Sequence, residues 1–385
     1  MKIAVVAIAY NRLNSIKRLL NSLSGADYCN EKIDLIISID KSDTTVVEDY
    51  ADEYYWPFGE KIVRKHKDNL GLRKHILSQG EAFETYDALV ILEDDIIVSP
   101  AFYKYGKQAI MQYCDNDQIA GISLYSYPLN YQNNNIFEPY KTGYDVYFMQ
   151  TAVSWGQIWL KNQWKAFYKW YLNNTDFKMS ADIPPVLFNW KKSWLKYHTR
   201  YCIENDKYFV FPYYSFSSNC CDIGVHAIAK YNSYQTVLQT DLRRSLILPK
   251  LLDDAACYDS FFENIACYNA LGMNKNILCL DINGQHKEYH KRYILTTKLL
   301  NYKILKSYGL FLRPIEANVL ADINGNEIYL YDSSSPQKNI NCNNKDSLKK
   351  YNLRLISWAT VLNYVGVKSF ASDIIKGLKK RINIK

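Results

Sequence analysis

The sequence lacks the features that mark several special classes of protein. None of its apolar runs reaches the roughly 20 residues that a bilayer-spanning helix requires, so we expect no transmembrane helix. The apolar stretch that begins at Lys2 is short and leads into structured sequence without a cleavage site, which argues against a signal peptide. There is no internal repeat and no low-complexity tract. A chain of 385 residues with ordinary composition therefore predicts a globular protein with room for more than one domain.

The cysteines and the basic residues also lack the patterns of two common kinds of site. The nine cysteines include no Cys-x-x-Cys spacing, and the adjacent pair Cys220-Cys221 does not suit zinc. An odd number of scattered cysteines fits reduced thiols, which predicts a cytoplasmic protein. The net charge of +8 allows an anionic partner such as nucleic acid, a membrane surface or a phosphorylated substrate. No arginine-rich stripe with interleaved aromatic residues is present, so we predict no nucleic-acid partner.

The first hundred residues contain a regular alternation of strands and helices. Apolar runs of strand length alternate with segments whose apolar residues recur at helical spacing. The expected strands are Lys2–Ala9, Asp34–Ile39, Lys61–Arg64 and Ala88–Leu92, and the expected helices are Leu13–Ser24, Thr44–Tyr55 and Gly71–Phe83. This order predicts an α/β protein with a mostly parallel sheet and helices on both faces.

The fourth of these strands ends in three consecutive acids, Glu93, Asp94 and Asp95. The five apolar residues before them predict a strand that is buried on both faces. Because unpaired charges are costly to bury, the acids must emerge at the carboxyl end of the strand, the edge where ligands bind in open α/β sheets. Adjacent carboxylates repel one another, and a divalent cation commonly relieves that repulsion. A solvated acidic turn is the alternative interpretation.

Polar residues follow the other strands of this half as well. The first strand ends in Tyr10-Asn11-Arg12 and the second in Asp40, while Asp68–Arg73 forms a glycine-containing turn that opens a helix. In a parallel sheet these ends share one edge, so they can converge on one ligand. An aromatic residue and a carboxylate suit a nucleobase, and a metal-binding acid pair suits a diphosphate.

The run Ile91–Tyr105, which contains the triplet, closely resembles the metal-binding stretch of N-acetylglucosaminyltransferase I and of bacterial family-2-like glycosyltransferases. These enzymes share the GT-A fold. Further matches follow in the same order along the chain: Ala7–Arg12, Asn69–Leu72, Ser154-Trp155-Gly156 with Trp159 and Trp164, Phe211–Asn219, and Asp222–His226. The resemblance covers about residues 1–229.

The resemblance implies a GT-A (nucleotide-diphospho-sugar transferase) fold, which is a doubly wound, mostly parallel sheet, with a mainly helical C-terminal extension. Residues 1–229 would form the catalytic domain, with a nucleotide-sugar half at about 1–115 and an acceptor half at about 116–229. Residues 230–350 would form a mainly helical extension with a hairpin, and 351–385 a basic amphipathic segment.

The resemblance also implies roles for single residues. Asp95 would hold Mn²⁺ or Mg²⁺, which bridges the donor phosphates, and His226 would complete the metal shell or grip a phosphate. Asp94 would contact the ribose or donor sugar, with Glu93 in support. The nucleotide-binding residues would be Tyr10, Asn11, Arg12, Asp40, Asn69, Gly71 and Arg73. The alternatives are a hydrogen-bonded loop histidine for His226, a helix N-cap for Asp40, sheet-edge packing for Tyr10 and plain surface charges for Arg12 and Arg73.

One position departs from the family pattern. Inverting transfer needs a base for the acceptor hydroxyl, and Lys191 stands where N-acetylglucosaminyltransferase I has an Asp. We therefore take Asp222 as the first candidate base and, with Asp94, as a catalytic residue; Asp182 and Glu204 follow. A surface or capping role is the alternative for each of the three candidate bases.

The resulting prediction is a metal-dependent glycosyltransferase of bacterial surface-polysaccharide synthesis, inverting, with a nucleotide-sugar donor (UDP-sugar favoured) and a glycan or lipid-linked oligosaccharide acceptor. A sugar nucleotidyltransferase is disfavoured because the turn after the first strand has no glycine-rich loop. A non-catalytic nucleotide- or glycan-binding module stays open because of Lys191.

The remaining sequence carries no functional motif. We expect helices over Leu246–Tyr268 and Tyr293–Tyr308, and a hairpin at Asn324-Gly325. Residues 351–385 carry seven basic residues and one acid, Asp373. Two interpretations of this segment stay open: it docks on anionic lipid at the inner face of the membrane, or it packs as a helix on the catalytic domain.

Overall fold

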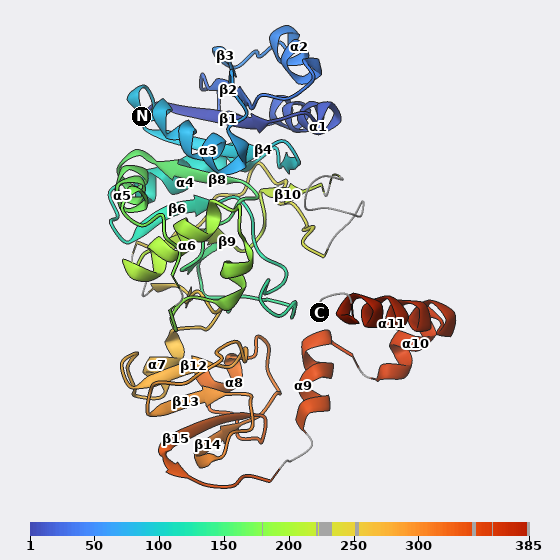
Figure 1. Cartoon of the computed structure of the whole chain (residues 1–385). Coiled ribbons are helices and arrows are strands. Elements are labelled where there is room, and N and C mark those ends of the chain that lie inside the picture. Colours follow the sequence, from blue (N-terminus) through green and yellow to red (C-terminus); the bar gives the residue numbers. More distant parts are fainter. Residues whose placement is uncertain are drawn as a thin grey trace.

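The chain forms two large β-sheets with separate cores, and C-terminal helices follow them (Figure 1). The structure is a computed structural model that describes residues 1–178, 180–220, 222, 233–250, 254–340, 344–355 and 357–382. All statements below concern these residues.

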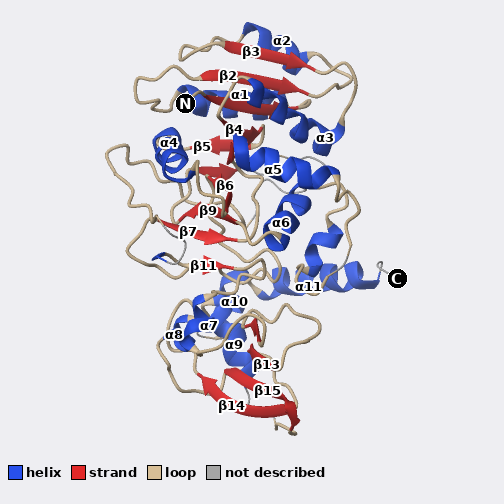
Figure 2. Cartoon of the chain, turned by 90° about the vertical axis from the view of Figure 1, so that its left-hand side faces the viewer, coloured by secondary structure: helices blue, strands red, loops and turns tan. Residues whose placement is uncertain are grey.

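The larger sheet has nine strands in the order β11-β7-β9-β6-β8-β4-β1-β2-β3, and Figure 2 shows most of them one above another. Their bounds are β1 Ile3–Ala9, β2 Asp34–Ile39, β3 Lys61–Lys65, β4 Ala88–Glu93, β6 Ile119–Ser123, β7 Val146–Met149, β8 Gln157–Leu160, β9 Tyr208–Pro212 and β11 Cys257–Tyr258. Parallel pairing joins β4, β1, β2 and β3, and also β6 with β9 and β7 with β11. The α/β class and the mostly parallel sheet are therefore confirmed.

Helices cover both faces of this sheet because its central strands are apolar on both sides. In β1, Val5 and Ala7 pack in one core cluster and Val6 and Ile8 in the other, as a period of two residues requires. The first face is covered by α1 (Leu13–Ser24), α2 (Val46–Glu53) and α4 (Phe102–Tyr113); the second by α3 (Gly71–Ser78), the 3₁₀ helix η1 (Gln79–Glu84), α5 (Lys161–Leu172) and α6 (Leu195–Glu204). A further 3₁₀ helix, η2 (Pro185–Asn189), precedes α6.

Helix α1 illustrates how strongly each helix is held to the sheet. Its apolar residues Ile16, Leu19, Leu20 and Leu23 lie on one face and are fully buried. Burying a side chain of this size contributes about 1.5–3 kcal/mol relative to exposure. The four side chains therefore fix α1, and with it the turn at its start, against β1.

Strand β1 lies at the point where the direction of winding reverses. From β1 the chain moves outward through β2 to β3, and then returns to place β4 on the opposite side of β1. Ligands in open α/β sheets bind at such a switch point, outside the carboxyl ends of the strands. The residues that follow β1 and β4 meet at this place. A small antiparallel pair lies beside it, formed by β5 (Ile96–Val98) and β10 (Ser217–Asn219).

The second sheet has four strands in the order β12-β13-β15-β14: β12 Leu278–Asp281, β13 Tyr293–Thr296, β14 Tyr302–Tyr308 and β15 Ile328–Pro336. Helices α7 (Ala266–Ala270) and α8 (Ala317–Leu320) accompany it. The prediction of a helix over Tyr293–Tyr308 is wrong. The apolar residues of this segment pack in two clusters, Leu295 in one and Ile294 and Ile304 in the other, which is the alternation of two strands.

Two other sequence predictions in this region are also corrected. Residues 255–265 are not helical, and Cys257–Tyr258 pairs with β7 as β11, so the long helix expected over Leu246–Tyr268 does not form; α7 begins only at Ala266, near the end of that range. Asn324-Gly325 forms no two-residue hairpin, because residues 309–327 connect β14 to β15 and contain α8. Gly325 is needed for another reason: a Cβ there would lie 2.2 Å from the Cα of Gly309.

The chain ends in three helices, α9 (Asn344–Leu353), α10 (Trp358–Val365) and α11 (Val367–Ile382), so the expected C-terminal helices are present. Figure 1 shows α10 and α11 standing out from the two sheets. Among the described residues, no helix combines the length and the apolar character that a membrane crossing requires.

Candidate functional site

The centre of the candidate site is the contact between Arg12, three residues after the end of β1, and Asp94, directly after β4. The guanidinium of Arg12 binds both carboxylate oxygens of Asp94. Its Nη2 donates to Oδ1, and its Nε donates to Oδ2 at 3.3 Å. The same Nη2 lies 3.6 Å from Oδ2 of Asp95. The Asp94 side chain is only 5% exposed, whereas those of Arg12 and Asp95 are 28% and 21% exposed. The three residues thus form a charged cluster that is open to solvent on the Asp95 side.

The acids of the triplet differ in their electrostatic state. Desolvation, with the neighbouring charges of Asp95 and Asp94, raises the pKa of Glu93 to about 8. Desolvation also raises the pKa of Asp94 to about 6, although Arg12 acts to lower it. The expected repulsion among the carboxylates is therefore relieved partly by Arg12 and partly by protonation of Glu93 at neutral pH.

Strand β10 brings a distant part of the chain to the triplet. It pairs antiparallel with β5, and the N–H of Cys220 then donates to the carbonyl of Asp95 at 2.8 Å. On its other side, the Ser217 hydroxyl donates to the carbonyl of Trp155 at 2.6 Å. The order of the pairing places Asp222 just beyond the triplet, beside α1.

Asp222 is engaged by an arginine of α1. Nη1 of Arg18 donates to Oδ1 at 3.1 Å, and Nη2 donates to Oδ2. Burial acts to raise the pKa of Asp222, but hydrogen bonds from Arg18 and Ser15 outweigh it, so the pKa is lowered. A carboxylate with a lowered pKa is a weaker proton acceptor. The assignment of Asp222 as the base stays a prediction, and the structure shows which partner would oppose it.

The other candidate bases are not brought to this cluster by any contact. Glu204, at the end of α6, is exposed and pairs with Arg200 at 2.6 Å. Asp182 is exposed, and its carbonyl accepts a weak hydrogen bond from Ser260 at 3.4 Å. Lys191, which stands at the family's base position, is also exposed, and its carbonyl accepts a hydrogen bond from Arg73.

Asp40 joins the end of β2 to the start of α3. Its buried carboxylate accepts the N–H of Leu70 at 2.8 Å and that of Gly71 at 2.9 Å, which satisfies free donors at the helix start. Asn69 strengthens this junction by donating to the carbonyl of Lys41 at 2.8 Å. Gly71 has φ of +71°, a conformation that glycine adopts without strain. These contacts hold the Asp40 carboxylate at the start of α3, and its role toward a base stays a prediction.

The remaining predicted nucleotide residues fall into two groups. Tyr10 and Asn11 lie at the carboxyl end of β1 with exposed side chains, Tyr10 being 41% exposed. Arg73, by contrast, donates to the carbonyl of Lys191 at 2.7 Å and to the hydroxyl of Tyr197 at 3.4 Å, and its guanidinium lies over the Tyr197 ring. Arg73 therefore joins α3 to the segment that opens α6.

The metal prediction is only partly addressed by the described residues. His226 lies outside them. Within them, no group of three or more His, Cys, Asp or Glu side chains is arranged to hold a metal ion.

Sequence reasoning missed two features of this region. Arg18 was not singled out, and no local pattern connects it with Asp222, which lies 204 positions further along the chain. The second is a buried network under Asp40, in which the Ser38 hydroxyl contacts Nε2 of His75 at 2.8 Å and accepts a hydrogen bond from Gln79 at 2.9 Å. A serine inside an otherwise apolar strand was the available signal.

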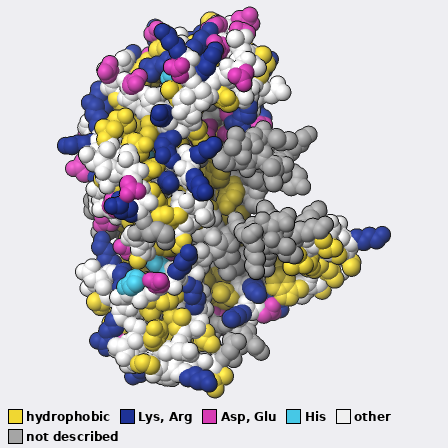
Figure 3. Space-filling model, in the orientation of Figure 1, with side chains coloured by type: hydrophobic (Ala, Val, Ile, Leu, Met, Phe, Trp, Pro, Cys, Tyr) yellow, Lys and Arg dark blue, Asp and Glu magenta, His cyan; other side chains and the backbone are white. Residues whose placement is uncertain are grey.

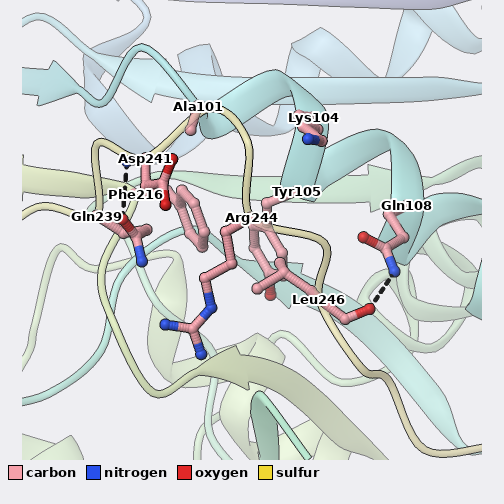
Figure 4. A pocket seen from close by; sticks show the side chains of 9 residues that line it. All are labelled: Ala101, Lys104, Tyr105, Gln108, Phe216, Gln239, Asp241, Arg244 and Leu246. Carbon is pink, nitrogen blue, oxygen red and sulfur yellow. Dashed lines mark hydrogen bonds between the residues drawn. The ribbon is translucent and has the colours of Figure 1, made fainter.

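A small pocket lies against α4, where the rings of Tyr105 and Phe216 stack at 4.5 Å beneath Arg244 (Figure 4). Its volume is about 10 Å³. That is room for about one water molecule, far below the 300 Å³ or more of a typical ligand pocket. This pocket is therefore not a candidate donor site.

Comparison with known proteins gives matches among solved structures only. No protein-family model and no curated protein sequence matches the chain. The chain is similar to residues 1–349 of S. aureus TarS in complex with UDP-GlcNAc, with 16% identity and a TM-score of 0.38 over 60% of this chain and 62% of that one. It is also similar to the mannosyltransferase PcManGT from Pyrobaculum calidifontis in complex with GDP-Man and Mn²⁺, with 11% identity and a TM-score of 0.35 over 55% and 56%. The chain thus spans about three fifths of the length of these structures.

Proposed function

We propose that the chain is a metal-dependent glycosyltransferase that moves a sugar from a nucleotide-diphospho-sugar, a UDP-sugar in preference, to a glycan or lipid-linked oligosaccharide in bacterial surface-polysaccharide synthesis. The observation that carries the proposal is the meeting of Arg12 with Asp94 and Asp95 at the switch point of the sheet. The resemblance of Ile91–Tyr105 to the metal-binding stretch of glycosyltransferases assigns a chemistry to the same residues.

The surroundings of the cluster suit a diphosphate. Helix α1 begins at Leu13, directly after Arg12, so its free N–H groups and the positive end of its dipole lie at the same edge. Arg12 and Arg18 add two permanent cations there. Helix starts and arginines are the groups that proteins use to bind phosphate oxygens. The exposed ring of Tyr10 is available to stack on a nucleobase.

The residues at the triplet also fit a hard divalent cation. Asp95 offers a carboxylate that is 21% exposed, and oxygen ligands of this kind are those that Mg²⁺ and Mn²⁺ prefer. When bound, the cation would neutralise the negative charge that develops on the departing nucleoside diphosphate. Asp95 would hold it, with Asp94 toward the ribose or donor sugar and Glu93 in support.

Inverting transfer further requires a proton acceptor on the acceptor side. Asp222 is the candidate, because β10 brings it to the triplet while Lys191 occupies the family's position. In this proposal Arg18 must loosen its hold on Asp222 when substrates bind, since the free carboxylate accepts a proton more readily. The competing function is a non-catalytic nucleotide- or glycan-binding module, which Lys191 and the Arg18–Asp222 pair favour.

Ligand-dependent stability tests the donor site. The melting temperature of the full chain is measured with UDP, GDP, dTDP and CMP, each with Mn²⁺ or with EDTA. A ligand that binds only the folded state raises stability, by about 2.7 kcal/mol at 100 times its Kd. We expect one nucleotide to stabilise the protein only when Mn²⁺ is present.

Two variants make the test specific. Asp95→Asn should remove the Mn²⁺-dependent stabilisation and lower transfer from the matching nucleotide-sugar by about 100-fold or more. The control variant Asp115→Asn alters an exposed acid that precedes β6, at the end of the strands opposite to the triplet. It should change neither the Mn²⁺-dependent stabilisation nor the transfer rate. Full transfer by Asp95→Asn would refute the metal site. Nucleotide binding without any transfer or donor hydrolysis would favour the binding module.

A further inference from the structure

The C-terminal helices α10 and α11 carry large apolar side chains that remain exposed. Val367 is 68% exposed, Ile375 53% and Leu378 52%. In α1, which packs on the sheet, the corresponding apolar residues are fully buried. Helix α11 thus has the amphipathic sequence of a packed helix without a partner that covers its apolar residues among the residues described. Such a surface marks an interaction site.

The exposed apolar residues of α11 form one continuous face. Val367, Phe370, Ile374, Ile375 and Leu378 follow one another at spacings of three, four, one and three residues. These spacings place all five on the same side of a helix with 3.6 residues per turn. Helix α10, which packs beside α11, adds Trp358, Leu362 and Val365, each exposed by more than a third. Figure 3 shows apolar side chains gathered on this projecting part.

The sequence around this apolar face is strongly basic. Residues 351–385 contain Arg354, Lys368, Lys376, Lys379, Lys380, Arg381 and Lys385, against the single acid Asp373. An apolar face in a segment rich in lysine and arginine suits the boundary of a bilayer with anionic headgroups, where apolar residues enter the acyl region and cations meet phosphate. A protein partner would need a matching acidic groove, whereas an anionic bilayer supplies both properties.

The placement of the helices fits this occupant. In Figure 1, α10 and α11 extend beyond the two sheets on the side of the molecule where α1 and β10 lie. In this view neither of the two sheets covers α10 or α11. We propose that α10 and α11 bind the surface of an anionic lipid bilayer and hold the chain there peripherally.

Vesicle flotation of the full chain tests the proposal without any donor or acceptor, so its outcome is independent of the proposed transferase activity. The probes are vesicles of phosphatidylcholine alone, which are neutral, and vesicles that contain about 30% phosphatidylglycerol, which present an anionic surface. We expect the protein to float with the anionic vesicles, to bind the neutral ones at least about tenfold more weakly, and to be released by high salt.

Variants separate the two parts of the surface. The double variant F370S/I374S should reduce partitioning by about tenfold or more, because both exposed side chains leave the apolar face. Lys368→Glu should reduce binding to anionic vesicles by about fivefold or more and leave the weak neutral binding unchanged. The control variant Tyr55→Ser alters a large side chain that is 79% exposed and lies far from α11 in the sequence. This variant should bind vesicles as the unaltered protein does.

Three results would overturn the proposal. The first is the absence of flotation with either vesicle. The second is flotation that F370S/I374S leaves unchanged, because another surface would then bind. The third is a concentration-dependent dimer in the absence of lipid that F370S/I374S abolishes while vesicle binding persists, since the apolar face would then serve a second copy of the chain. All variants alter exposed positions, and unchanged melting temperatures would confirm that they fold.

Discussion

Replacing Arg12 by Met is the sharpest test of the charged cluster. The change keeps a side chain of similar length and removes the cation that Asp94 and Asp95 share. Breaking a buried ion pair by removing one partner costs about 3–5 kcal/mol, because the remaining charge is left unpaired. Since Arg12 is 28% exposed and Asp94 only 5%, water screens part of the interaction. We expect a loss of about 2–3 kcal/mol in the free energy of unfolding.

Urea unfolding followed by circular dichroism measures this loss, and a double-mutant cycle assigns it. Asp94→Asn should cost clearly less in the Arg12→Met background than alone, with a coupling energy of about 1–3 kcal/mol. A cost below about 0.5 kcal/mol, or additive costs, would show that the pair seen at the switch point contributes little in solution and would refute the reasoning.

Mn²⁺ distinguishes a structural pair from a ligand site. In the absence of nucleotide, removal of Arg12 takes away a cation 3.6 Å from Asp95, so Mn²⁺ should bind the variant more tightly and raise its melting temperature more than that of the unaltered protein. With nucleotide present the order should reverse, because the variant lacks a phosphate-binding group. Equal Mn²⁺ effects in both proteins would refute a cation site at Asp95.

Two further predictions concern buried groups outside this cluster. Burial raises the pKa of Asp259 to about 7, so the folded state binds a proton that the unfolded state releases near pH 4, and stability should fall as the pH rises from 4 to 7. The variant Asp259→Asn keeps the Oδ1 atom that accepts the N–H groups of Phe261 and Glu263. Urea unfolding at pH 8 should show this variant to be more stable than the unaltered protein by roughly 2–4 kcal/mol. An equal or lower stability would contradict the prediction. Burial lowers the pKa of His198 to about 3, and among the described residues neither ring nitrogen has a hydrogen-bond partner. His198→Phe should therefore raise stability by about 1 kcal/mol and reduce the loss of stability as the pH falls from 6.5 to 3, whereas destabilisation in thermal melts would indicate that the ring is needed for shape.

The sequence predicts the first half of the fold well because the information there is local. Strand β1 is an uninterrupted apolar run, β4 is one up to Glu93, and β2 is interrupted only by Ser38; in the structure all three are buried on both faces. Tyr293–Tyr308 was misjudged because its apolar residues, taken together, also fit a helical spacing. Only their division between two packed clusters reveals two strands, and that division depends on contacts with β15.

The same distinction holds for the candidate site. That the ends of β1 and β4 share one edge follows from parallel pairing, so the convergence of Arg12 with the acidic triplet was predictable. The contact that each carboxylate makes could not be predicted in the same way. Asp40 is committed to the start of α3, and Asp222 to Arg18, by contacts between segments that are distant in sequence. Such pairings depend on tertiary packing, which no local spacing encodes.

The contacts of Arg73 connect two segments of the chain that are distant in sequence. Its guanidinium binds the carbonyl of Lys191 and lies 4.9 Å from the centre of the Tyr197 ring, so it bridges the expected nucleotide half and the expected acceptor half of the sheet. Any motion that separates these two halves would have to break the contacts of Arg73 with Lys191 and Tyr197. Helix α3 and the start of α6 are therefore expected to move together as long as these contacts are intact.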